Sequence, residues 1–165
     1  MHHSLEEHFA QMEQNKQLIW QMLDGIDETK FHLKKNDRTW SLAQVFDHVI
    51  YSEESALNYC EKKMQAGDQM PDGSFFNSLK IKIYFWALLT KLRFKAPKPI
   101  SNPSNDRSLQ RTKAYWDQTR DAYVRFLEDY PAKYLGKAVF KHPLAGRIKL
   151  DEMLRFLNTH LIHHQ

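Results

Sequence analysis

The clearest helical pattern in this chain is Ser41-Leu42-Ala43-Gln44-Val45-Phe46-Asp47-His48-Val49-Ile50. Ser41 is a favourable N-cap, and Gln44 three residues later completes a capping box. Apolar side chains then recur at the three- and four-residue spacing of one helix face: Leu42, Val45, Phe46, Val49 and Ile50. We predict a helix from Ser41 to about Ala66, ending before a glycine-bounded loop over residues 67–73.

Similar patterns lie on both sides of this segment. A first helix is predicted to begin at Ser4, with Glu7 completing a second capping box, and to end near Gly25. Further helices are predicted over about residues 75–92 and 108–130, and a shorter one begins at Leu150. Residues 75–92 are apolar nearly all round in their middle, which indicates either a central buried helix or an interface helix.

These segments predict an all-α fold, a four-helix bundle with a short irregular segment over residues 133–149 before the last helix. The chain has only 5 glycines and few β-branched runs. Residues 95–105 contain three prolines and are expected to form a loop, either a linker or a lid. With 165 residues and 42% hydrophobic content, we expect one domain over residues 1–165.

Composition excludes several classes of protein. One cysteine, Cys60, excludes an intrachain disulfide and a zinc-thiolate cluster, and it fits a reducing compartment. The N-terminus becomes acidic at once and lacks a signal-peptide pattern. No apolar run reaches the ~18 residues of a membrane span. We therefore expect a soluble, cytoplasmic protein without a membrane partner.

The net charge of +4 raises the question of nucleic-acid binding. A binding groove needs a contiguous basic stripe. Here the basic residues occur as short pairs scattered along the chain, which favours ordinary solvated faces. We expect no nucleic-acid partner, and a salt-sensitive shift with duplex DNA would revive that alternative.

The histidines suggest a metal site. His160 and His164 are four residues apart, so on a helix they lie one turn apart on one face. His48 lies far upstream at the border of an apolar helix face, and three neutral imidazoles on two helices would make a metal site with open positions. Each part of this pattern also has a simpler interpretation. His160 and His164 alone could form a polar helix end, and His48 alone could be a hydrogen-bonded core residue.

Two blocks at opposite ends of the chain resemble the DinB superfamily of four-helix bundles. The first is residues 39–49, in which a Trp-Ser helix start, Trp40-Ser41, precedes His48 by seven residues. The second combines a His-Pro turn at residues 142–143, a glycine, a helix and the histidine pair before Gln165. Two departures are Leu42, where the family often has proline, and Lys149, where it usually has a Ser or Thr cap.

The resemblance implies that His48, His160 and His164 hold a divalent metal ion, usually nickel, zinc or iron, with water in the open positions. His163 is expected to lie outside this triad, and His142 to shape the turn before the last helix. Characterised relatives include metal-dependent hydrolases and transferases or isomerases that use a low-molecular-weight thiol. The resemblance also implies a homodimer.

We therefore expect a metal-dependent enzyme with a small-molecule substrate, whose catalytic residues stay unassigned. Such an ion lowers the pKa of bound water to about 7 or stabilises a thiolate. Gln44 and Ser52, one turn on either side of His48, are candidates to orient water or substrate, although an ordinary polar edge fits equally. Glu53 and Glu54 are nearby, but spacing does not fix their roles. The alternative is a non-catalytic, stress-related metal-binding or interaction protein.

Overall fold

The structure is a computed structural model that describes residues 1–90 and 101–164. Within these ranges, six α-helices, two short 3-10 helices and one hairpin follow one another along the chain. They are α1 (His3–Met22), α2 (Glu28–His32), α3 (Leu42–Met64), η1 (Gly67–Gln69), α4 (Phe75–Leu88), α5 (Leu109–Glu128), η3 (Ala132–Tyr134), β1 (Phe140–His142), β2 (Gly146–Ile148) and α6 (Leu150–His163).

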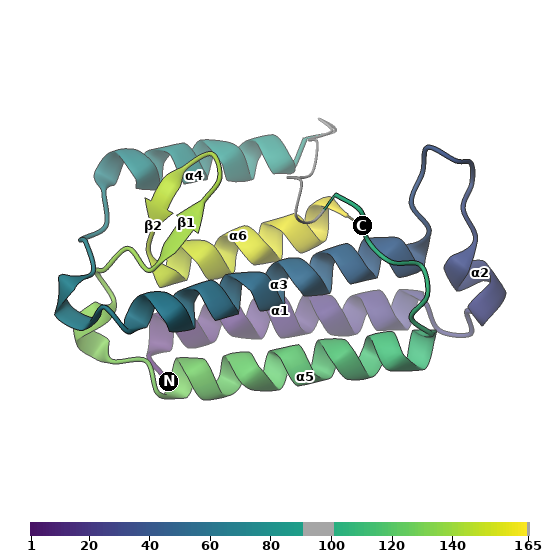
Figure 1. The fold of residues 1–165 in the computed structure, drawn as a ribbon, viewed down its shortest axis with the longest axis horizontal. Helices are drawn as coiled ribbons and strands as arrows, with labels where there is room; N and C mark the ends of the chain where they lie inside the picture. Colours follow the sequence, from purple (N-terminus) through teal and green to yellow (C-terminus); the bar gives the residue numbers. More distant parts are fainter. Residues whose placement is uncertain (91–100, 165) are drawn as a thin grey trace.

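Helices α1, α3, α5 and α6 lie side by side as a bundle, and α4 packs outside them against α6 and the β1–β2 hairpin (Figure 1). The all-α prediction and the irregular segment before the last helix are confirmed, with the hairpin and η3 filling that segment. Of the two alternatives for residues 75–92, a central buried helix or an interface helix, the structure excludes the first. α4 buries only Ile81, Phe85 and Leu88, because a helix that is apolar all round does not specify which face turns inward.

The two predicted capping boxes had different outcomes. At α3 the Ser41 hydroxyl accepts from the Gln44 amide, and the Gln44 side chain accepts from the Ser41 amide, as predicted. The box at Ser4 was wrong, because α1 already begins at His3 and its N-cap is His2. The short α2 was not predicted, although Asp27 caps it by accepting from the Lys30 amide at 2.7 Å.

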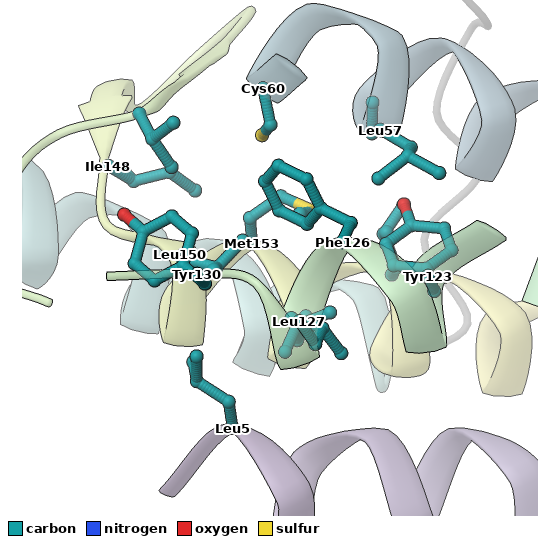
Figure 2. Packing of buried hydrophobic residues seen from close by; sticks show 14 of the residues in the cluster. Leu5, Leu57, Cys60, Tyr123, Phe126, Leu127, Tyr130, Ile148, Leu150 and Met153 are labelled. Atoms are coloured by element: carbon teal, nitrogen blue, oxygen red, sulfur yellow. The ribbon is translucent and has the colours of Figure 1, made fainter. Parts of the chain in front are cut away.

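Two apolar clusters form the core. The larger cluster joins the N-terminal half of α1, the C-terminal half of α3, α5 and α6, and includes Leu5, Cys60, Tyr123 and Met153 (Figure 2). Burial raises the pKa of the Cys60 thiol far above its usual range, so this cysteine is a buried small hydrophobe and not a nucleophile. The second cluster, around Phe31, Phe46 and Trp116, lies near the N-terminal end of α3.

A buried ion pair links α3 to α5 inside the bundle. Glu53 and Arg120 are 1% and 2% exposed, and both carboxylate oxygens of Glu53 accept from the guanidinium at 2.8 and 2.9 Å. The Trp116 indole N–H donates to the same carboxylate at 2.9 Å. This arrangement satisfies the buried charges and fixes the register of the two helices.

The described part of the segment before α5 is fastened to the start of α3. Asp47 accepts from the Ser104 amide at 2.9 Å and from the Arg107 guanidinium at 2.7 Å. Asn105 contacts the Ser41 hydroxyl and donates to the His32 carbonyl. These contacts confirm a loop for residues 101–105, while residues 95–100 of the predicted loop lie outside the described residues. The helix predicted over residues 75–92 ends earlier than expected, because α4 ends at Leu88.

No helix within residues 1–90 and 101–164 is both long and apolar enough to cross a membrane.

Candidate metal centre

The three predicted histidines meet at one end of the bundle. His48 lies in the second turn of α3, and His160 lies in the last turn of α6. His164 is the C-cap of α6 and keeps a helical backbone, so it follows His160 on the same face. His48 and His160 are 112 positions apart in the sequence, and the packing of α3 against α6 brings them together.

The ring nitrogens converge on His160. Its Nε2 lies 3.2 Å from Nε2 of His48 and 3.2 Å from Nε2 of His164. One ligand atom from each ring lies within 4.8 Å of the others. Two nitrogens bound to one zinc ion with tetrahedral geometry lie about 3.3 Å apart. The donor set and its spacing therefore fit one transition-metal ion held by three imidazoles.

Burial and the neighbouring rings keep His160 and His164 neutral by lowering their pKa values. Burial lowers the pKa of His160 well below the usual value for histidine, and the neighbouring His164 and His48 lower it further. Burial, followed by His48 and His163, lowers the pKa of His164 to about 4. Neutral imidazole is the form that binds a metal ion, so at pH 7 the His160 and His164 rings need not release a proton to bind one.

Aromatic rings flank the histidines. The Trp40 ring lies 5.0 Å from the His48 ring, and the Phe156 ring stacks on His160 at 5.7 Å. These contacts hold the imidazoles in place and cover part of their faces. Trp40 belongs to the Trp-Ser motif of the sequence, but the packing of Trp40 and Phe156 on the histidines was not predicted. The i, i+4 spacing of Phe156 and His160 was the available signal.

His163 projects away from the triad, as expected, and joins α6 to α4. Its Nδ1–H donates to the Leu88 carbonyl oxygen at 2.7 Å. Leu88 is the last residue of α4, where a helix leaves carbonyl groups without an intrahelical partner. The hydrogen bond therefore fastens the final turn of α6, which carries the metal-site histidines.

His142 has the turn-shaping role expected of it. Its Nδ1 accepts from the amides of Leu144 and Ala145 at 3.2 and 3.1 Å, at the tip of the hairpin. The ring is 2% exposed, and burial lowers its pKa to about 4. His142 thus serves as a neutral acceptor in the hairpin.

Four polar candidates near His48 have structural roles. The Gln44 side chain completes the capping box and donates to the Pro103 carbonyl at 3.0 Å. The Ser52 hydroxyl donates to the His48 carbonyl at 2.7 Å. Glu53 pairs with Arg120, and Glu54 accepts from the Tyr115 hydroxyl at 2.6 Å. None of these contacts assigns a catalytic role to the four residues.

A cavity of about 390 Å³ opens elsewhere, at the beginning of α6. Its lining includes Phe85 and Lys82 of α4 and Asp151 and Arg155 of α6. The histidines lie at the other end of α6, so this cavity is not part of the metal centre.

Comparison with known protein families matches residues 11–165 to the family model of the DinB superfamily. The match covers all but the first ten residues, so the chain belongs to the DinB superfamily. No curated protein matches the chain.

Proposed function

We propose that this member of the DinB superfamily binds one divalent metal ion through His48, His160 and His164 and acts on a small molecule. The observation that carries the proposal is the convergence of three Nε2 atoms with 3.2 Å between neighbours. Three protein ligands leave coordination positions open, which is the arrangement of catalytic rather than structural sites. Nickel, zinc and iron all accept imidazole, so the ion that is bound depends on supply as well as on ligands.

The bound ion would supply Lewis acidity, which a hydrolase uses to activate water and a thiol-dependent transferase or isomerase uses to stabilise a thiolate. The chain's own thiol does not suit the second role, because Cys60 is buried in the apolar core with a raised pKa. A low-molecular-weight thiol would therefore be the co-substrate in that reaction class.

The residues around the triad would position the ligands. Trp40 and Phe156 pack on the rings of His48 and His160 and limit the orientations of these imidazoles. His163 would hold the end of α6 so that His164 stays beside His160. These contacts would lower the ordering cost of binding an ion.

The experiment compares metal-loaded protein with His160→Ala in screens of ester and amide hydrolysis and of thiol transfer to electrophiles. Turnover by the wild type that requires both the metal and His160 supports the enzyme. Tight metal binding without exchangeable coordination positions or turnover would instead favour the alternative, a non-catalytic metal-binding protein. Pairing of two copies stays a prediction, which the mass in solution tests.

A further inference from the structure

The outer face of α4 is apolar and exposed. Its six large exposed side chains are between 47% and 77% exposed: Phe75, Phe76, Leu79, Ile83, Trp86 and Leu89. They fall on one side of the helix, opposite the buried Ile81, Phe85 and Leu88. Together they expose roughly 700 Å² of apolar surface, above the ~300–600 Å² of the largest patch on a typical monomer.

Basic residues surround this apolar face. Lys80 and Lys82 are exposed on α4, and Lys141 and Arg147 are exposed on the adjoining hairpin. None of the four forms a salt bridge with another described residue. The hairpin lies beside α4, with the Asn77 amide donating to the Arg147 carbonyl at 3.0 Å (Figure 1). The exposed Leu144 at the hairpin tip extends the apolar surface.

The fold gathers charge that is dispersed along the sequence. Residues 73–105 and 130–150 contain eleven of the 24 basic residues and none of the 20 acidic ones. Four of the eleven fall in residues 91–100, outside the described part of the chain. Of the seven that the structure describes, Lys133 and Lys137 pair with Asp68 and Asp72, so the positive charge of this face rests on Lys80, Lys82, Lys141 and Arg147.

We propose that the outer face of α4 and the hairpin tip dock on the surface of an anionic lipid bilayer. A helix with aromatic and aliphatic residues on one face and lysines at its flanks lies in the bilayer interface without spanning it. Each nearby lysine or arginine adds electrostatic attraction to anionic headgroups. This proposal departs from the expectation of no membrane partner, which rested on the absence of a spanning segment and not on surface binding.

Two other occupants fit less well. A second copy meeting the same face across a two-fold axis would place the basic residues Lys80, Lys82, Lys141 and Arg147 of both copies in one interface. Single-stranded nucleic acid uses basic grooves with aromatic rings for base stacking. Here three of the six exposed residues on α4 are aliphatic, and Leu144 is also aliphatic, which suits acyl chains and not bases.

The test measures co-sedimentation of the full-length protein with vesicles of phosphatidylcholine alone or with 30% phosphatidylserine. We expect binding to the anionic vesicles that weakens as salt is raised. The double variant Ile83→Asp/Trp86→Asp should weaken binding by about two orders of magnitude, because it removes two inserted side chains. Lys80→Gln/Lys82→Gln should weaken it by about 20-fold.

Matched controls use residues outside this face. Leu18→Asp/Met22→Asp makes the same chemical change at the exposed side chains of α1, and both control residues are at least half exposed. The affinity of this control variant for anionic vesicles should stay within about threefold of that of the wild type. The proposal would be overturned if this control lost as much vesicle binding as Ile83→Asp/Trp86→Asp. It would also be overturned if the wild type did not bind anionic vesicles. A wild-type dimer that Ile83→Asp/Trp86→Asp converts to a monomer, or tighter binding to single-stranded DNA than to vesicles at equal salt, would overturn it as well.

Discussion

The Nδ1 atom of His163 and the carbonyl oxygen of Leu88 lie 2.7 Å apart and join the last turn of α6 to the end of α4. Helix ends fray, and His164 stands at such an end. The hydrogen bond, with the neighbouring Leu161 only 3% exposed, holds that turn against the rest of the molecule. Order at the end of α6 thus depends on a helix outside the bundle.

Replacing His163 should therefore weaken metal binding without removing a ligand. In His163→Phe, we expect metal affinity about fivefold lower, since one hydrogen bond contributes ~1 kcal/mol. Competition with a chromophoric chelator measures the affinity. His3→Phe, which removes an exposed histidine of α1, is the control and should leave the affinity unchanged. Equal affinities in His163→Phe and wild type would contradict the role of this hydrogen bond.

The buried ion pair predicts a large difference between two adjacent glutamates. Glu53→Gln should lower the free energy of unfolding by about 3 kcal/mol, because the buried Arg120 would keep only the more exposed Glu13 as a charged partner. Glu54→Gln, beside a half-buried hydrogen bond to Tyr115, should cost less than about 1 kcal/mol. Urea unfolding monitored by circular dichroism measures the free energy of unfolding of both variants. Similar losses in the two variants would contradict a larger stabilising role for the buried pair.

The capping analysis predicts unequal effects at two serines. Ser41→Ala removes an N-cap acceptor and should cost about 1–2 kcal/mol of stability. Ser4→Ala should be close to neutral, since Ser4 lies inside α1 and is not its N-cap. Thermal or urea unfolding measures the stability of both variants. A comparable loss at Ser4 would mean that α1 begins later than residue 3.

Stability should fall with acid in a way that depends on His142. Its pKa is lowered to about 4 in the fold, whereas an unfolded histidine titrates near 6.5. Between these pH values the unfolded state binds a proton that the folded state does not. The contribution of His142 to the free energy of unfolding is therefore fully present above pH 6.5 and is lost as the pH falls towards 4. The contribution is about 1.4 kcal/mol per pH unit in the middle of this window.

The measurement is urea unfolding of metal-free protein at pH 7 and pH 5, for the wild type and His142→Asn. Asparagine retains an acceptor for the turn amides but does not titrate, so the variant should lose less stability between the two pH values. Its lower stability at pH 7, caused by lost ring packing, does not affect this comparison. Parallel losses in the two proteins would exclude His142 as the titrating group.

Local patterns predicted part of this fold well. Ser41 and Gln44 act through contacts three residues apart, so their capping box followed from the sequence. The box at Ser4 failed because the same residue pattern also occurs within a helix that has already begun. The orientation of α4 could not be predicted, since its apolar residues surround the helix. The hairpin was expected only as part of an irregular segment.

The candidate site was predicted from spacing and resemblance, and the structure brings its three histidines together. Its supporting contacts depend on tertiary packing and were not predicted. The His163–Leu88 hydrogen bond joins residues 75 positions apart, and the Glu53–Arg120 pair joins residues 67 positions apart. No local periodicity encodes such distances. The gathering of basic residues beside α4 was missed for the same reason.

The most direct test of the metal centre is elemental analysis of protein purified without nickel resin, comparing the wild type with His160→Ala. His160 is the variant to use, because its Nε2 is the atom nearest to both other ligands. We predict about one transition-metal ion per wild-type chain and almost none in His160→Ala, with both proteins folded. Metal-free wild type that stays empty after reconstitution with nickel, zinc and iron would contradict the account and leave the three histidines with a structural role.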